Sequence, residues 1–435
     1  MSDLSFVRSE MIPEQAPPAS TVGVIGWMRE NLFDGWFNST LTVISVAFIY
    51  YILAGMVPWI WSPTWNATSL GNCREILHGL GREGHYAGAC WGVINDRWVQ
   101  LLFGFYPADQ YWRPIAAFIL LFVALAPVLF AEKVPPKLIW FTAAFPFLMP
   151  WLLWGGTIWT PIMAALGFVV AYYVYGLVAD KAGSLTGIIV SVIAAVVWWL
   201  LLTGLLSGAL ASIVPLALES VESRNFGGMM LSLTIGIVAI GFSLPIGIVL
   251  ALGRQSDLLI VKALCVGFIE FIRGVPLITL LFVASTLLNI FMPPGTNFDI
   301  IMRVMIMATL FSAAYMAETI RGGLAALPKG QYEGADSLGL NYWQSQRLII
   351  MPQALKISIP GIVGNFIGLF KDTTLVSVIG LLDPLGLSNA IRADADWNGI
   401  VWELYGFIAL LFFVFCFGMS RYSMYLERKL QTGHR

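Results

Sequence analysis

The sequence predicts an all-α polytopic membrane protein with about ten transmembrane helices. Apolar residues of the AVILMFWYC set make up 58% of the 435-residue chain, and charged residues only 11%, against roughly 25% in an average soluble domain. The net charge is −1, so the chain has no basic excess for nucleic acid. Ten largely apolar runs have roughly the 20-residue length that a membrane span needs. This composition excludes a soluble enzyme, a disordered protein and a nucleic-acid-binding protein.

Each apolar run is one expected span. In chain order the spans are expected at 41–61, 113–131, 138–154, 158–178, 187–207, 228–251, 264–290, 301–318, 357–379 and 402–420. The third is short and contains Pro146, which predicts a kink or tight pairing with the fourth. The first 38 residues are polar and the first apolar run is a full span, so no cleavable signal peptide is expected.

The distribution of basic residues predicts the orientation. With a cytoplasmic N-terminus, 15 of the 24 Lys and Arg residues fall inside, 6 fall outside and 3 lie in or at the ends of spans. This excess inside favours cytoplasmic N- and C-termini, because ten spans return the chain to its starting side.

A long Trp- and Gly-rich loop near 62–112 is expected outside and contains Cys73, His78, His85 and Cys90. A Cys73–Cys90 disulfide is the favoured reading, since the predicted side is oxidising. A metal site built from the four side chains has suitable ligands but an unfamiliar spacing. Two unrelated free cysteines are the third reading.

The most informative polar stretch is 318–356, which interrupts the apolar pattern on the predicted cytoplasmic side. Its centre, from Gly330 to Leu340, is compatible with a short helix, and Pro328 and Pro352 limit it on both sides. A solvated loop is the ordinary interpretation. Small residues that allow close backbone approach, with aromatic residues beside them, favour a helix that docks on a partner.

The same stretch resembles the EAA loop of ABC importer permeases, whose pattern is E-A-A-x3-G-x9-I-x-L-P. Gly334 stands where the family has Ala, and Met351 where it has Leu. In that family the loop forms a coupling helix that sits in a groove of the ATPase subunit. The resemblance therefore implies that ATPase coupling is carried by Glu333, Gly334, Ala335, Asp336, Gly339 and Pro352.

Three further segments resemble the polar amino-acid branch of this family, at 270–277, 318–323 and 370–375. The first half of the chain resembles the extended permease of general L-amino-acid and glutamate/glutamine/aspartate/asparagine transporters. The expected organisation is a cytoplasmic segment at 1–40, an extension of about five helices at 41–225, and a five-helix type I ABC importer permease core at 226–435 with its coupling loop near 321–356.

The resemblance implies ATP-driven alternating access in the cell inner membrane. A periplasmic binding protein would deliver a polar amino acid to two permease subunits, the second one a related chain. The sequence contains no G-x-x-x-x-G-K-[ST] motif, so ATP and Mg²⁺ are expected on separate ATPase subunits. The chain itself is expected to be non-catalytic and to hold no cofactor or metal.

Charges inside spans are costly and need partners. Glu270 and Arg273 share a helix face, which favours an internal ion pair that fixes a bend at Gly274-Val275-Pro276 over direct substrate contact. Glu318 and Arg321 lie at the cytoplasmic end of a span and suggest a structural pair or a gate.

A second group of polar residues falls within the span at 357–379. Ordinary bonding between helices is the commoner use of such side chains, and lining of a translocation path is the alternative. The candidates for the path are Asn365, Lys371, Asp372, Thr373, Thr374 and Ser377.

A secondary transporter driven by an ion gradient shares this composition and these charges. It does not account for the spacing of the 318–356 loop, and we find no clear internal repeat that would favour an inverted-repeat carrier. A membrane scaffold or receptor subunit leaves the four family-like motifs unexplained.

Overall fold

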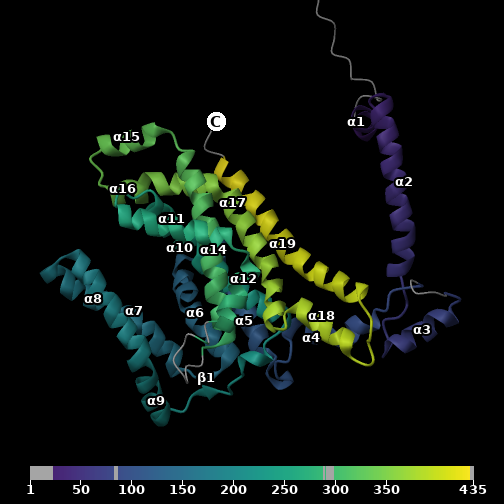
Figure 1. The fold of residues 1–435 in the computed structure, drawn as a ribbon, viewed down its shortest axis with the longest axis horizontal. Coiled ribbons are helices and arrows are strands. Elements are labelled where there is room, and N and C mark those ends of the chain that lie inside the picture. The colour runs from purple at the N-terminus through teal and green to yellow at the C-terminus, as the bar shows by residue number, and fades with distance from the viewer. Residues whose placement is uncertain (1–22, 83–86, 288–289, 291–297, 432–435) are drawn as a thin grey trace, which may run out of the picture. The chain divides into compact units, whose positions relative to one another are not determined.

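The computed structural model describes residues 23–82, 87–287, 290 and 298–431. It consists of two compact units, Met1–Gly92 and Val93–Arg435 (Figure 1). Among the described residues, nine helices are long and apolar enough to cross a membrane, and a tenth results if one bent helix pair is counted as a single span. The predicted all-α polytopic fold with about ten spans is confirmed.

The first unit holds one long apolar helix followed by a disulfide-linked loop. Its helices are α1 (Gly23–Leu32), α2 (Gly35–Ile60) and α3 (Leu70–Gly79). Cys73 of α3 is bonded to Cys90, with the Cα atoms 5.8 Å apart. These two sulfurs are therefore not available as metal ligands, and His85 of the metal-site reading lies outside the described residues.

The second unit begins with the remaining helices of the predicted extension, whose first span is α2 of the first unit. They are α4 (Gly92–Phe103), α5 (Trp112–Leu129), α6 (Ile139–Trp154), α7 (Trp159–Ala182), α8 (Ser184–Val197) and α9 (Thr203–Ile213). A π-helical turn at Trp198–Leu202 joins α8 to α9, so these two form the fifth predicted span. The strands β1 (Gly156–Thr157) and β2 (Ala217–Leu218) pair antiparallel and close this half of the unit.

The helices of the predicted core follow. They are α10 (Gly228–Arg254), α11 (Leu259–Gly274), α12 (Leu277–Phe282), α14 (Ile300–Ala325), α15 (Lys329–Ser337), α16 (Tyr342–Ser345), α17 (Met351–Asp372), α18 (Pro384–Ala393) and α19 (Trp402–Gln431). In Figure 1, α15 lies at one end of this helix bundle and α18 at the other. We call these ends the α15 side and the α18 side.

The seventh predicted span is bent rather than straight. It consists of α11 and the helix Leu277–Leu287, which meet at 101°. Pro276 lacks a backbone N–H and disfavours helical geometry in the residue before it. Accordingly Val275 is extended, with φ −110° and ψ 132°. The bend lies at the Gly274-Val275-Pro276 segment.

Helices of the predicted extension and of the predicted permease core contribute to one hydrophobic cluster within the second unit. Leu121 of α5 and Phe145 of α6 belong to the same buried cluster as Ile235 of α10 and Val304 of α14. The compact units therefore divide at residue 92, whereas the sequence analysis divided the chain near 225. The functional boundary at 226 stays a prediction.

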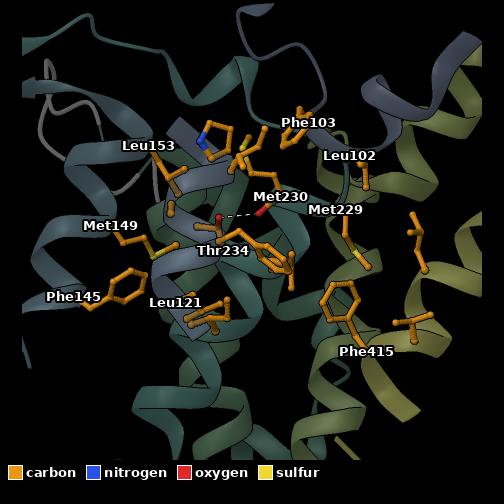
Figure 2. A pocket seen from close by; sticks show the side chains of 18 residues that line it. Leu102, Phe103, Leu121, Phe145, Met149, Leu153, Met229, Met230, Thr234 and Phe415 are labelled. Atoms are coloured by element: carbon orange, nitrogen blue, oxygen red, sulfur yellow. Dashed lines mark hydrogen bonds between the residues drawn. The ribbon is translucent and has the colours of Figure 1, made fainter. Parts of the chain in front are cut away.

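An apolar cavity of about 390 Å³ remains between α4, α5, α6, α10 and α19. Figure 2 shows Leu121, Phe145 and Met149 facing Met230 and Phe415 across it. The labelled polar side chain, Thr234, donates its hydroxyl to the Met230 carbonyl at 2.8 Å. The cavity thus presents an almost wholly apolar lining.

Candidate functional site

A short helix, α15, occupies the centre of the predicted coupling loop. It follows Pro328 and ends in a Schellman arrangement. The Gly339 N–H donates to the Asp336 carbonyl at 2.9 Å, and the Leu340 N–H donates to the Ala335 carbonyl at 3.3 Å. Gly339 has φ +68°, a left-handed conformation that Gly adopts without a Cβ penalty. Gly339 therefore sets the end of α15.

The two faces of α15 differ in exposure. Ala335 is fully buried, whereas Glu333, Gly334 and Asp336 are exposed. Gln353 Nε2 of α17 donates to Gln331 Oε1 at 2.7 Å and ties the helix to the bundle. The small side chain of Ala335 thus lets α15 lie close to the protein, and the carboxylates are left accessible.

A capping box starts the next helix, α16. The Asn341 side chain accepts from the Gln344 N–H at 2.9 Å, and Gln344 Oε1 accepts from the Asn341 N–H at 3.0 Å. Large side chains around α16 remain exposed, at 73% for Leu338, 71% for Trp343 and 64% for Leu348. We define the coupling surface as Glu333, Asp336, Leu338, Tyr342, Trp343 and Leu348. Such an apolar patch edged by carboxylates is typical of a protein interaction site.

Pro352 lies two residues into α17, which continues from α16 through a π-helical turn at Gln346–Ile350. A proline inside a helix lacks a hydrogen-bond donor and crowds the preceding turn. A widened turn immediately before it relieves this crowding. Pro352 therefore stands inside a continuous helical segment rather than at its boundary.

α14 and α17, the helices on either side of the loop, are in close contact. A Cβ at Gly323 of α14 would collide with Ser358 Oγ and the Ala354 carbonyl of α17, and one at Gly361 would lie 2.7 Å from the Thr319 side chain. Ser358 Oγ also donates to the Thr319 carbonyl at 3.2 Å. The coupling loop is thus anchored at both ends by one tightly packed helix pair.

Five charged side chains form one cluster on the α15 side. Arg254 Nη1 of α10 lies 2.9 Å from Glu270 Oε1 and 3.2 Å from Glu318 Oε2. Arg273 Nη1 of α11 lies 3.5 Å from Glu318 Oε2. Arg321 donates Nε to Glu318 Oε1 at 2.9 Å. Glu318 therefore receives three guanidinium groups from three helices.

This cluster differs from the pairing that the sequence suggested for Glu270 and Arg273. In the described part of the chain the ion pairs of these two residues run to Arg254 and Glu318, not to each other. Arg254 was missed, because it reads as an ordinary basic residue at the end of a span. The Glu318–Arg321 pair is present as expected.

The predicted path residues lie on α17 and the 3-10 turn that follows it. Asn365 Nδ2 donates to Thr319 Oγ1 of α14 at 2.8 Å, which is ordinary bonding between helices. The hydroxyls of Thr373, Thr374 and Ser377 donate to carbonyls of their own preceding turn. Lys371 is exposed and Asp372 is partly buried. The line of polar side chains is therefore present, and a role in translocation stays a prediction.

Asp383 on the α18 side escaped the sequence analysis. It is fully buried and caps α18 by accepting from the N–H groups of Leu385 and Gly386 at 3.1 and 3.0 Å. Burial raises the pKa of Asp383 to about 6, against the lowering effect of these hydrogen bonds. The Asp-Pro dipeptide at 383–384 is a helix-start signal that could have identified it.

Comparisons with known proteins place the chain among transport proteins. Residues 243–432 match the family described as "Binding-protein-dependent transport system inner membrane component". The chain is 58% identical over 437 residues, 100% of both chains, to the glutamate/glutamine/aspartate/asparagine transport system permease protein BztC of Rhodobacter capsulatus. It is 39% identical to the inner membrane amino-acid ABC transporter permease protein YhdY of Escherichia coli, over 94% of this chain and 93% of that one.

A shorter relative matches about half of the chain. The probable glutamine ABC transporter permease protein GlnM of Bacillus subtilis is 29% identical over 49% of this chain and 95% of its own. These similarities favour the importer hypothesis over the ion-gradient alternative.

Proposed function

This chain belongs to the permease subunits of ATP-binding-cassette importers, and from that membership we propose that it conducts polar amino acids across the inner membrane. The substrates proposed are glutamate, glutamine, aspartate and asparagine, or a broader L-amino-acid set that includes them. The full-length similarity to BztC supports this set, because it covers the extension as well as the core. We also propose that the N- and C-termini lie in the cytoplasm, so that the α15 side is cytoplasmic.

The coupling surface carries this proposal. It combines two exposed carboxylates with exposed Leu338 and Trp343 on helices that are tied to α14 and α17. Separate ATPase subunits would bind this surface and hold ATP and Mg²⁺. Docking can drive transport only if its free energy differs between the open and closed ATPase states. The tight α14–α17 contact would pass the resulting displacement to the transmembrane helices.

Two further partners complete the proposed assembly. A periplasmic amino-acid-binding protein would deliver substrate to the α18 side. A second, related permease subunit would form the other half of the translocation path, in which Asn365, Lys371, Asp372, Thr373, Thr374 and Ser377 are the candidate lining residues of this chain. Glu270, Arg273, Glu318 and Arg321 would act as structural or gating charges at the cytoplasmic end.

The experiment is charge reversal at the centre of the coupling surface. In proteoliposomes that contain the assembled transporter and its binding protein, Glu333→Arg should lower ATP-dependent uptake of labelled glutamate at least tenfold, because it opposes an interface contact. It should also reduce copurification of the ATPase. Membrane insertion should be unchanged, because Glu333 is exposed and makes no side-chain ion pair within the described residues.

The matched control is Asp180→Arg. Asp180 is an exposed acidic residue near the end of α7, so the variant makes the same charge change away from the coupling surface. Its uptake should equal that of the wild type. Normal uptake by Glu333→Arg, with the ATPase still bound, would remove the coupling role from α15.

A further inference from the structure

A hollow of about 820 Å³ with a mixed polar and apolar lining opens on the α18 side of the second unit. Glu222, Ser223 and Arg224, from the segment that precedes α10, line one part of it. Arg303 of α14 and Gly380, which follows the 3-10 turn Thr373–Ile379, line another part. The rest of the lining is apolar and consists of Phe226, Phe298, Ile300, Leu381 and Leu382. The hollow therefore lies at the end of the same helical segment that carries Lys371 to Ser377, the candidate path residues.

Arg303 is the distinctive side chain of this hollow. Only 7% of it is exposed. Its Nη1 donates to the Ser285 carbonyl at 2.7 Å and to the Ala284 carbonyl at 3.5 Å. Its buried Nε has no hydrogen-bond acceptor, and no carboxylate lies within ion-pair distance among the described residues.

A buried guanidinium without a counter-ion is unfavourable unless something else compensates its charge. Two backbone carbonyls hold the position of Arg303 but contribute only partial charge. An anion that enters the hollow would supply the missing counter-charge. The fixed position of the guanidinium would lower the entropic cost of binding that anion.

The other charges around the hollow match one class of small anion. Arg224 adds a second guanidinium, and Glu222 two residues earlier adds one carboxylate. A free amino acid carries at least one carboxylate and one ammonium group. Two basic side chains and one acidic side chain are complementary to this combination, whereas inorganic anions would be repelled by Glu222.

We propose that this hollow is a receiving site for the free amino acid on the periplasmic side, where Arg303 and Arg224 bind a carboxylate and Glu222 binds the ammonium group. This inference rests on the proposed function, because it takes the transported substrate as the ligand. The substrate would occupy the hollow after leaving the binding protein and before reaching the segment 371–377. Arg303 is thus a substrate-binding residue held in place by the carbonyls of Ala284 and Ser285.

The test measures equilibrium binding of radiolabelled L-glutamate to the assembled transporter in nanodiscs, without the binding protein. Arg303→Gln should weaken binding at least tenfold, since a hydrogen bond to a charged group is lost. Arg303→Lys should recover part of the affinity. Arg224→Gln, at an exposed position, should weaken binding about three- to tenfold.

The matched control is Arg74→Gln. It removes an exposed arginine of α3 in the first unit, and its affinity should equal that of the wild type. Glutarate, which lacks the ammonium group, should compete less well than glutamate. Glu222→Gln should reduce the difference in affinity between glutamate and glutarate.

The proposal is overturned if the wild-type transporter binds no glutamate at millimolar concentration, or if Arg303→Gln binds it normally. If Arg303→Gln fails to fold, unchanged affinity in Arg224→Gln overturns it instead. The proposal is also overturned if the variants lose association with the binding protein but bind free glutamate normally. That result would identify the hollow as a protein-docking surface. ATP-dependent uptake by the wild type tests the proposed function separately. If the wild type shows uptake and these variants do not change glutamate binding, the proposed importer function stands and only the receiving site is rejected.

Discussion

Gly339 and Asn341 fix the geometry of the coupling loop between them. Gly339 accepts a left-handed conformation that ends α15, and Asn341 begins α16 two residues later with a reciprocal cap. Each effect is local and follows from the identity of a single residue, so it can be predicted from the sequence. The turn between α15 and α16 therefore depends on local interactions, whereas the Gln353–Gln331 hydrogen bond ties α15 to the bundle.

Asp383 makes stability depend on pH. Its pKa is about 6 in the folded protein and 3.8 in an ordinary setting, so the folded state holds a proton that the unfolded state releases between these values. The stabilising contribution is complete below about pH 4 and is lost as pH rises through about 6. A shift of this size corresponds to about 3 kcal/mol.

Asp383→Asn should remove this dependence. The amide oxygen can still cap α18, while the group no longer ionises. Thermal unfolding in detergent should show the variant gaining stability relative to the wild type as pH rises from about 4 to about 6. Asp396→Asn, at an exposed position of the same loop region, serves as the control and should follow the wild type. Parallel pH curves for Asp383→Asn and the wild type would contradict the prediction.

At the scale of elements, charges join helices that the apolar pattern leaves unrelated. α10, α11 and α14 converge where Arg254, Arg273 and Arg321 meet Glu318. The spans themselves could be predicted because length and hydropathy are local properties. The bend at Pro276 was also predictable, since proline disrupts a helix by itself. The pairing was not: Arg254 and Glu318 are 64 residues apart, and only packing brings them together.

Glu318→Gln should loosen this junction. It leaves three guanidinium groups facing one another with only Glu270 to compensate them. The side chain of Glu318 is 23% exposed, so we expect a loss of about 1–3 kcal/mol, below the range for fully buried pairs. The measurement is the midpoint of thermal unfolding.

Glu270→Gln provides the comparison for Glu318→Gln. Glu270 is one of the two ion-pair partners of Arg254 among the described residues, and its side chain is 54% exposed. Its loss should therefore lower the stability by less than half as much as Glu318→Gln does. In a second test, Arg321→Gln added to Glu318→Gln should restore part of the stability by removing like-charge repulsion. Equal effects of the two single variants would mean that Glu318 is not the centre of the cluster.

At the scale of the whole molecule, the division into compact units does not coincide with the division suggested by the sequence motifs. Most of the family-like motifs lie after residue 226, and the sequence analysis placed the boundary between extension and core there for that reason. Packing follows a different rule, because any apolar face can be buried against any other. Trp154 stacks on Phe226 with ring centroids 4.4 Å apart, and Tyr106 meets Phe226 edge to face with ring centroids 5.6 Å apart. Burial at this junction also raises the pKa of Tyr106 to about 12.

The coupling surface could be proposed from the sequence for a related reason. Its residues are contiguous, and their family spacing is preserved along one short segment. Arg303 and the hollow around it come from three separate parts of the chain, so no local pattern marks them. Sites that are assembled by packing are therefore the ones for which the structure was needed.

A shared core predicts that damage in the extension reaches the permease helices. Leu153 of α6 is 2% exposed and lies in the cluster that contains Ile235 and Val304. Leu153→Ala should cost about 1–3 kcal/mol, chiefly through lost packing contacts, because helix association within a bilayer draws little on hydrophobic transfer. Hydrogen exchange should then quicken in α10 and α14 as well as in α6. Ile139→Ala, on the same helix but 47% exposed, should leave exchange in α10 and α14 unchanged. If Leu153→Ala quickens exchange in α6 alone, the extension unfolds independently and the boundary near 225 describes the molecule better than the compact units do.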